Sequence, residues 1–279
     1  SLTQIKTTAG VLASCGTALP RSIRAQEHLE YTQPLLQQTP VLFTNGTLRF
    51  HLTPFRFGVV PFNVTLTDDF GLSLSRLLCF TVFPVNHAPT FSLRENVVHV
   101  IETSKGEDLA LEGLAYNMHP GQLEEHQNMS FVLNVMEAQI PERPNLGWEP
   151  AKLADVLGGT GGRDELQLFE NGSSISLDVT NGTLSFRLEA KRYGKVRFAV
   201  TLCDDGGTAN GGVDKSLVHV LLIDVMPVND APTFVMGLPL SFDEQPVQRT
   251  YNNIEIGSDV RTGPWGEESQ IASVRLVQT

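Results

Sequence analysis

An eight-residue phrase that occurs twice constrains the fold of this chain more than any other feature. PVNHAPTF occupies 84–91 and PVNDAPTF occupies 227–234, so the copies differ at one position, His87 against Asp230. Each phrase contains two prolines, which favour extended backbone and cannot donate a hydrogen bond to a sheet. The phrase therefore predicts a rigid joint between repeated units, not the interior of a strand.

The residues around each joint recur as well. The run TNGTLRFHLTPFRFGVVPFNVTLTDDFG begins at Thr44, and TNGTLSFRLEAKRYGKVRFAVTLCDDGG begins at Thr180, a shift of 136 residues. Downstream, the E-x-Q at 125–127 matches the E-x-Q at 268–270 at a shift of 143. Self-similarity at a fixed period indicates one supersecondary unit used repeatedly. We expect a tandem array that continues beyond both ends of this sequence.

The period predicts three domains. Residues 1–87 form the C-terminal part of one repeat, and residues 88–230 form a complete repeat with an insertion near 137–164. Residues 231–279 begin a third repeat. A chain of 279 residues is long enough for more than one small domain, which agrees with this division.

Apolar residues alternate with polar ones at the spacing of half-buried strands. The expected inward residues are Val60, Phe62, Val64 and Leu66 in the first copy, and Val196, Phe198, Val200 and Leu202 in the second. A longer apolar strand is expected at 216–225, and a short helix at 150–159. Short strands separated by Gly, Asn and Pro predict an all-β chain of antiparallel sandwiches, about seven strands per unit.

The run at 200–234, VTLCDDGGTANGGVDKSLVHVLLIDVMPVNDAPTF, resembles the end of a cadherin-like repeat. It is more similar still to the tandem VNDAP immunoglobulin-like repeats of bacterial adhesins and of algal or protist mastigoneme-like surface glycoproteins. The resemblance implies tandem immunoglobulin/cadherin-like sandwiches at the cell surface. Two departures concern calcium: LEAKRYG at 188–194 replaces the L-D-R-E segment of cadherins, and Ala231 replaces a second Asn.

Calcium at the second joint is what the resemblance implies next. Its ligands would be Glu102, Asp204, Asp205, Asn229 and Asp230. Hard cations prefer several carboxylate and carbonyl oxygens, so His87 predicts a weaker site at the first joint. The alternative is that Asp230 caps a turn and that the DDGG run is a solvated loop. No organic cofactor is expected.

Five Asn-x-Ser/Thr sequons favour an extracellular location in a eukaryotic source. They lie at Asn45, Asn63, Asn128, Asn171 and Asn181. The register places Asn63 on the outward face of its strand. The alternative for the N-G-T at Asn45 and Asn181 is that Asn-Gly is retained because it makes a tight turn.

The three cysteines leave two interpretations open. Cys15 and Cys79 fall in the same unit and form a disulfide bond in one interpretation, or remain two buried free thiols in the other. Cys203 is in register with the outward Thr67, so an interchain disulfide is a further hypothesis.

Charge and motifs exclude several functions. A net charge of -11 argues against nucleic acid and acidic membranes as partners, and no apolar run is long enough to insert into a membrane. Nucleophile-elbow, zincin, P-loop and C-x-x-C motifs are missing from the sequence. Asp68 with Asp69, and Glu124 with Glu125, are adjacent pairs that a strand sends to opposite faces. We therefore expect no enzyme activity.

Three functional hypotheses remain. The first is a non-enzymatic building block of an extracellular filament, coat or flagellar hair, whose partners are other copies of itself or other surface glycoproteins. The second is a calcium-stiffened stalk of a cell-surface adhesin. The third, a carbohydrate-binding module, rests on Trp148 and Trp265 in loops rich in Gly and Pro.

Overall fold

The chain forms two compact units of strands. The structure is a computed structural model that describes residues 2–4, 34–139, 147–158, 162, 166–237, 239–245, 247–252, 254–263 and 270–277. The first unit comprises Ser1–Pro89, Pro120–Asn128 and Asp204–Asp214, and the second comprises Thr90–His119, Met129–Cys203 and Lys215–Thr279. Nearly all of the regular structure is strand, so the predicted all-β class is confirmed.

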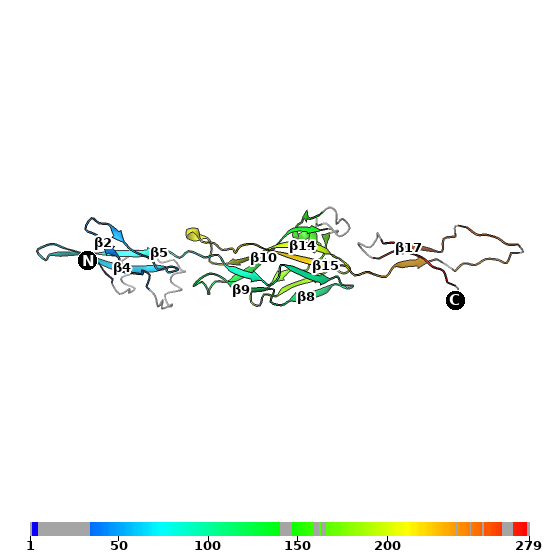
Figure 1. Ribbon diagram of the computed structural model, residues 1–279, viewed down its shortest axis with the longest axis horizontal. Helices are drawn as coiled ribbons and strands as arrows, with labels where there is room; N and C mark the ends of the chain where they lie inside the picture. The colour runs from blue at the N-terminus through cyan, green and yellow to red at the C-terminus, as the bar shows by residue number, and fades with distance from the viewer. Residues whose placement is uncertain are drawn as a thin grey trace. The chain divides into compact units, whose positions relative to one another are not determined.

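The first unit is built on one long hairpin. Its strands are β1 (Leu2–Gln4), β2 (Val41–Leu42), β3 (Leu48–Arg49), β4 (Gly58–Thr67) and β5 (Ser73–Val82). They form a sheet in the order β1-β4-β5 and a separate pair, β2 with β3. Phe62 of β4 is buried, and its ring centroid lies 5.3 Å from that of Phe80 on β5. The β4–β5 hairpin is drawn in blue and cyan in Figure 1.

The second unit is a β-sandwich followed by a short hairpin. Its strands are β6 (Thr90–Leu93), β7 (Val97–Ile101), β8 (Glu107–Leu111), β9 (Ala115–His119), β10 (Met129–Gln139), β11 (Glu149–Pro150), β12 (Ser176–Leu177), β13 (Leu184–Leu188), β14 (Gly194–Asp204), β15 (His219–Met226), β16 (Thr233–Met236) and β17 (Gly257–Arg261). One layer has the order β11-β10-β14-β15-β7, and another has the order β12-β13-β8. The remaining pairs are β6 with β9 and β16 with β17.

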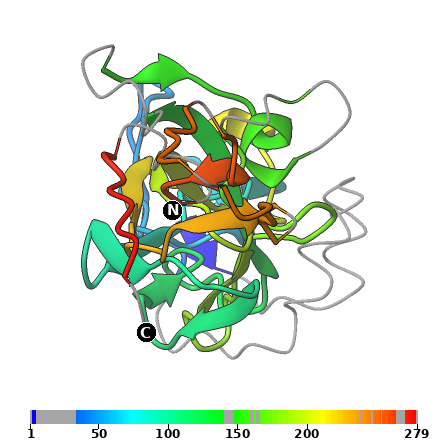
Figure 2. The ribbon, with the colours of Figure 1, turned by 90° about the vertical axis from the view of Figure 1, so that its right-hand side faces the viewer.

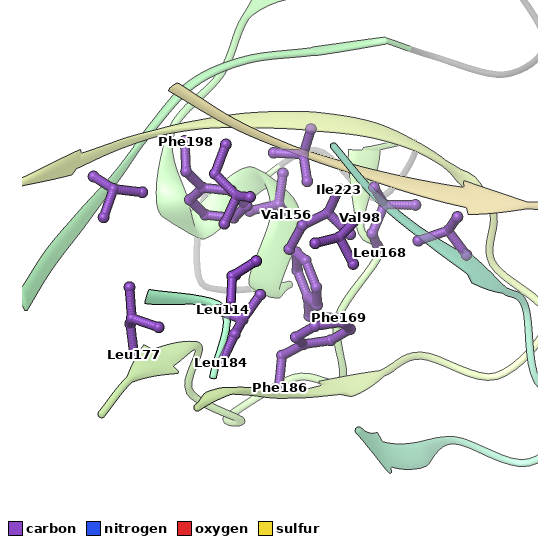
Figure 3. Packing of buried hydrophobic residues seen from close by; sticks show 14 of the residues in the cluster. Val98, Leu114, Val156, Leu168, Phe169, Leu177, Leu184, Phe186, Phe198 and Ile223 are labelled. Carbon is purple, nitrogen blue, oxygen red and sulfur yellow. The ribbon is translucent and has the colours of Figure 1, made fainter. Parts of the chain in front are cut away.

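A hydrophobic cluster fills the space between the two layers. The predicted inward residues of β14 are all fully buried in it: Val196, Phe198, Val200 and Leu202. Figure 3 shows Phe198 on one side of the cluster, and Leu184 and Phe186 from β13 on the other. Side chains alternate across a strand, so every second residue of β14 contributes to this core.

The inward face predicted for β4 is buried only in part. Phe62 is buried, Val60 and Val64 are half-buried, and Leu66 is exposed. In the second unit a three-stranded layer covers the equivalent face of β14, whereas the described part of the first unit has only the short β2–β3 pair beside its larger sheet. The pattern of residues is the same, but the described residues around β4 form no layer as large as the one that covers β14.

The predicted helix is present and shorter than expected. Helix α3 spans Leu153–Leu157, and Figure 2 shows it as a single green coil. The carboxylate of Asp155 accepts a hydrogen bond of 2.7 Å from the N–H of Lys152, which caps the first turn. Gly158 ends the helix with a left-handed backbone, a conformation that glycine adopts without steric cost.

The two long hairpins have the same register, which matches the repeat found in the sequence. Gly58 pairs with Val82 in the first hairpin, and Gly194 pairs with Val225 in the second. Between the hairpins the first strand shifts by 136 residues and the second strand by 143. The pairs β6–β9 and β16–β17 also share one irregularity, a register shift after the first residue of β6 and of β16.

The two compact units divide the chain differently from the three predicted domains, which remain a prediction. Residues 1–87 do fall in the first unit, but so do the segments Pro120–Asn128 and Asp204–Asp214, which the prediction assigns to the complete repeat. These two segments are loops that hydrogen-bond to the first joint, and those bonds place them with it. The second unit continues through the second joint to Thr279.

The repeated N-G-T turn provides a matched test of packing. Gly46 and Gly182 both have positive φ, but a Cβ on Gly46 meets no atom within 4 Å, whereas one on Gly182 collides with the carbonyl oxygen of Ala115. We expect Gly46→Ala to lower the free energy of unfolding by about 1 kcal/mol, and Gly182→Ala by about 2–4 kcal/mol. Denaturant unfolding of both variants measures this, and equal losses would contradict the packing difference.

Candidate functional site at the first joint

Polar side chains from three segments meet at the first joint, 84–91. One segment is the joint itself, and the second is the loop Pro120–Asn128 between β9 and β10. The third is the loop Asp204–Asp214 between β14 and β15, which contains a short 3-10 helix, η3 (Ala209–Gly211). Residues 84–89 of the joint and both loops belong to the first unit, so their contacts form one local site.

Asn86 is the residue on which both loops converge. Its side chain is buried, and its Nδ2 donates to Asp204 Oδ1 at 2.7 Å and to the Val213 carbonyl at 2.8 Å. Its Oδ1 accepts from Gln127 Nε2 at 2.7 Å. The backbone carbonyl of Asn86 accepts from the Val213 N–H at 3.0 Å. A buried amide with these partners avoids the cost of unpaired polar atoms and fixes the joint against the loops.

The next residue, His87, is held by a buried carboxylate. Its backbone N–H donates to Glu124 Oε1 at 3.2 Å, and its ring Nδ1 lies 3.0 Å from the same oxygen. Gly121 lies directly against this carboxylate, because a Cβ at Gly121 would collide with Glu124. The two joints differ only at His87 and Asp230, and His87 therefore has a specific partner, Glu124.

Asp205 forms a second link between the two loops. Its Oδ2 accepts from Asn128 Nδ2 at 2.8 Å, and its Oδ1 accepts from the Asn128 N–H at 2.9 Å. The side-chain hydrogen bond from Asn128, followed by the backbone one, holds the pKa of the Asp205 carboxyl below its ordinary value of 3.8. Both bonds favour the ionised carboxylate, so the link belongs to the charged form of Asp205.

Two glycines make the space for this arrangement. A Cβ on Gly206 would collide with the side chains of Asn86 and Gln127, and one on Gly212 would lie 3.0 Å from Asn86 Cβ. Gly206 of the DDGG run therefore leaves the space that the Asn86 side chain occupies, so this run is more than a solvated loop. In the first hairpin Phe70, which is 93% exposed, stands at the position equivalent to Gly206.

Two oxygens at the site are buried without a hydrogen-bond partner in the described part of the chain. They are Asp204 Oδ2 and Gln127 Oε1, and each belongs to a side chain that bonds Asn86. A buried carboxylate oxygen and a buried amide oxygen are hard donors of the kind that calcium selects. No three His, Cys, Asp or Glu side chains among the described residues group to hold a metal, so any ion here would also need amide or backbone oxygens and water.

The second joint has different contacts. Glu102 Oε1 accepts from the Val228 N–H at 2.6 Å, and Asp230 Oδ1 lies 3.0 Å from Lys191 Nζ. Asn229 Nδ2 donates to the backbone carbonyl of Asp230 at 3.2 Å. A lysine ammonium already neutralises the carboxylate that was expected to bind calcium.

The predicted calcium set does not form one site. Glu102, Asn229 and Asp230 lie at the second joint, while Asp204 and Asp205 bond the first joint and its loop. The reason is strand direction. β14 and β15 are antiparallel, so Asp204, the last residue of β14, lies at the opposite end of the pair from residues that follow β15. The joints differ in that Asp230 pairs with Lys191 at the second joint, while two oxygens at the first joint have no hydrogen-bond partner among the described residues; calcium binding at either joint stays a prediction.

Three residues of this site, Asn86, Gln127 and Gly206, are not among the site residues that the sequence predicts. A signal for Gln127 was present, because E-x-Q recurs with the joint period. A signal for Gly206 was the replacement of Phe70 by glycine in a loop seven residues longer. Neither reveals the partner, since Asn86 lies 41 residues from Gln127 in the sequence and far from Gly206 as well, and contacts at such separations depend on the sheet order.

All five sequon asparagines are exposed. Asn45 and Asn181 also make the expected turn, in which the side-chain oxygen accepts from the N–H of Thr47 at 3.0 Å and of Thr183 at 2.9 Å. These two asparagines therefore make the turn and are also exposed, as attachment of a glycan requires. Asn128 differs because its Nδ2, the atom that carries a glycan, donates to Asp205.

The cysteines are in different states. Cys79 is disulfide-bonded, and Cys203 is a free thiol that is partly buried. Cys15 lies outside the described residues. The isolated bridge between Cys203 and Lys215 continues the β14–β15 pairing at this point.

The remaining candidates from the sequence, where they are described, make contacts within the fold. The Arg197 guanidinium stacks over the Trp148 ring at 3.8 Å, which covers one face of that indole. Trp265 and most of the glycine-rich run at 158–166 lie outside the described residues. Asp68 caps its own hairpin turn by accepting from the N–H groups of Phe70 and Leu72.

No helix in the described residues is both long enough and apolar enough to cross a membrane.

Comparisons with known proteins identify no family. No protein-family model and no curated protein sequence matches this chain. Among solved structures, murine CEACAM1b is similar with a TM-score of 0.23 and 12% identity, over 66% of this chain and 67% of that chain. An endo-fucoidan hydrolase of glycoside hydrolase family 107, MfFcnA4, is similar with a TM-score of 0.24 and 15% identity, over 70% of this chain and 22% of that chain.

The Asp205 link predicts a specific pH dependence. Its pKa is lowered on folding, so the link stabilises the fold above the ordinary value of 3.8 and is lost as the pH falls through the lower, folded pKa. We expect the Asn128 amide resonances to shift only below pH 3.8, and Asp205→Asn to abolish the shift. Asp178, whose pKa is also lowered, provides the control, because Asp178→Asn should leave Asn128 unchanged. A midpoint at or above 3.8 would contradict the link.

Proposed function

We propose that this chain is a non-enzymatic structural repeat protein located outside the cell, and that it is a building block of a surface filament, coat or flagellar hair. The observation that carries the proposal is the repeated hairpin. Two hairpins have one register, and each is followed by an eight-residue joint that differs between them at one position. Repeating one unit along a chain extends a structure without requiring a reaction centre. Its partners would be copies of itself or other surface glycoproteins.

The contacts at the first joint support this role. A linker between structural units must resist bending, and the bonds of Asn86 and His87 fix both side chain and backbone. The carboxylates of Asp204, Glu124 and Asp205 accept hydrogen bonds from Asn86, His87 and Asn128. Carboxylates used in this way hold segments of the chain together, as expected of a structural site. The cluster lies in loops, whose conformation is otherwise the least constrained part of a sandwich.

A second candidate function is a calcium-stiffened stalk of a cell-surface adhesin. The observation that favours it is the pair of unpartnered oxygens, Asp204 Oδ2 and Gln127 Oε1. These residues fit a weak calcium site in which the ion would supply the positive charge that this part of the cluster lacks. Calcium at millimolar affinity is typical of extracellular modules.

Microscopy of native material tests the structural role. An antibody against 88–230 should label the body of a filament, coat or hair at regular intervals. Label confined to a stalk that ends in a different domain would favour the adhesin. Label on dispersed molecules that belong to neither kind of structure would overturn both.

Calcium should act at the first joint. At ten times its Kd, calcium is expected to raise the Tm of the wild type by about 3–6 °C. Asp204→Asn keeps the oxygen that bonds Asn86 and removes the charge, so it should abolish the increase. Asp230→Asn is the matched control at the second joint and should retain the increase. The same Tm in calcium and in chelator for the wild type would remove calcium from the proposal.

Glycans should be attached at Asn45, Asn63 or Asn181 in native eukaryotic material. Their side chains are exposed, and Asn63 lies in β4 opposite Leu77 of β5. Peptide-N-glycosidase should lower the intact mass and convert each occupied Asn to Asp. An intact mass equal to that of the bare chain would contradict the prediction.

A further inference from the structure

The outer face of the three-stranded layer β12-β13-β8 carries a row of short side chains. Ser185 of β13 lies opposite Ala110 of β8 on one side and opposite Ser176 of β12 on the other. Leu184 and Phe186, its neighbours in β13, point into the core (Figure 3), so Ser185 points to the outer face. Three short side chains in line leave a low floor across this layer.

A charged row bounds the floor on one side. Arg187, two residues after Ser185 on the same face, lies opposite Asp108 and donates from Nη1 to its carboxylate at 2.9 Å. Its Nε donates to the carboxylate of Glu170. These two bonds use only some of the N–H groups of a guanidinium, and the Asp108 side chain is 80% exposed. Both side chains therefore keep groups that a ligand can reach.

The loop before β12 supplies the remaining wall of a hollow. Gly172, Ser173 and Ser174 line it together with the two rows, and its volume is about 480 Å³. Sites for small molecules have volumes of roughly 300–1,000 Å³, so the hollow is large enough for one. All of its lining residues belong to the described ranges and to the second unit.

One group in this wall is unpaired. The Ser173 hydroxyl oxygen is buried and has no hydrogen-bond partner among the described residues, although the Ser173 N–H donates to the Glu170 carbonyl at 3.0 Å. A buried hydroxyl without a partner carries a desolvation cost. Turning it to another staggered rotamer sacrifices no hydrogen bond. A polar ligand group in the hollow would therefore remove this cost.

The groups around the hollow suit a neutral ligand with several hydroxyl groups. Asp108 accepts hydrogen bonds, Arg187 donates them, and serine hydroxyls do both. A sugar hydroxyl also does both, so neighbouring hydroxyls of one ring can bond an acceptor and a donor at the same time. A charged ligand is disfavoured, because an anion would meet Asp108 and Glu170, and a cation would have to displace Arg187 from both carboxylates.

We propose that this hollow binds a saccharide, whose hydroxyl groups bond Asp108, Arg187 and Ser185. Phe186 is the one aromatic residue among those that line the hollow, and its ring points into the core. Because no aromatic face is available to stack on the sugar ring, we expect weak binding that needs millimolar saccharide. Neither tryptophan of the sequence belongs to this lining. The binding activity goes beyond the proposed structural role and does not depend on it.

A saccharide in this hollow has two sources. Asn171, an exposed sequon residue, directly precedes Gly172 in the wall. A glycan attached to Asn171 begins beside the hollow, so its own sugars would occupy the site in glycosylated protein. The other source is a saccharide of a different molecule, which would enter an otherwise empty hollow.

Amide NMR spectra of the full chain, made without glycans, test the site. N-acetylglucosamine, glucose, galactose and mannose are added separately, and at least one should shift the Ser173 and Ser185 resonances saturably. Ser185→Val fills the floor and Asp108→Ala removes an acceptor, so each should weaken binding by about tenfold or more. Ser130→Val is the matched control and should bind as the wild type does, because Ser130 is an exposed strand serine that does not line the hollow.

Native glycosylated protein distinguishes the two sources. If the Asn171 glycan occupies the hollow, added sugar should bind only after treatment with peptide-N-glycosidase. Equal binding before and after treatment would identify a saccharide of a different molecule, and both results support the site.

Three outcomes would overturn the proposal. The first is the lack of a saturable shift with any of the four sugars, and the second is unchanged binding by Ser185→Val. The third is a shift of the same resonances by inorganic phosphate and by none of the sugars, which would indicate an anion site. Each can occur whether or not native material lies in filaments, so failure of the saccharide site is distinguishable from failure of the proposed function.

Discussion

The β14–β15 hairpin is the element on which the rest of the described structure depends. Its inward side chains are buried in the core, and burying each large apolar side chain contributes about 1.5–3 kcal/mol. The loop that connects the two strands carries Asp204, Gly206 and Val213, which receive the joint. The register of the hairpin sets which of its side chains enter the core, and the loop sets which groups bond Asn86.

Local patterns predicted the strands well because a strand has a period of two residues. The alternation at Val196, Phe198 and Val200 was sufficient to predict the buried face of β14. The same alternation at Leu66 predicted burial that the structure does not have. Alternation records which face can be buried, but whether another layer covers that face depends on distant parts of the chain. Sheet order and the parallel pairing of β7 with β15 were likewise beyond local patterns.

The polar site was harder to predict for a topological reason. Asp204 and Asp230 are close to the same strands in sequence, and the resemblance to cadherins placed them in one calcium site. An antiparallel turn sends them to opposite ends of the pair. Asn86 was visible in the joint, but its role required the space at Gly206, a residue 120 positions away. The contact needs a donor at Asn86, an acceptor at Asp204 and the space left by Gly206. These residues do not lie in one stretch of the sequence.

The one position at which the joints differ now has a physical explanation. His87 lies against the carboxylate of Glu124, and Asp230 lies against the ammonium of Lys191. The prolines and the shared Asn favour an extended backbone in both joints, while the variable residue has a different partner in each. Exchanging the two residues would place Asp beside Glu124 and His beside Lys191, so like charges would meet at the first joint. The two joints therefore share seven residues, and the one residue that differs contacts different neighbours in each joint.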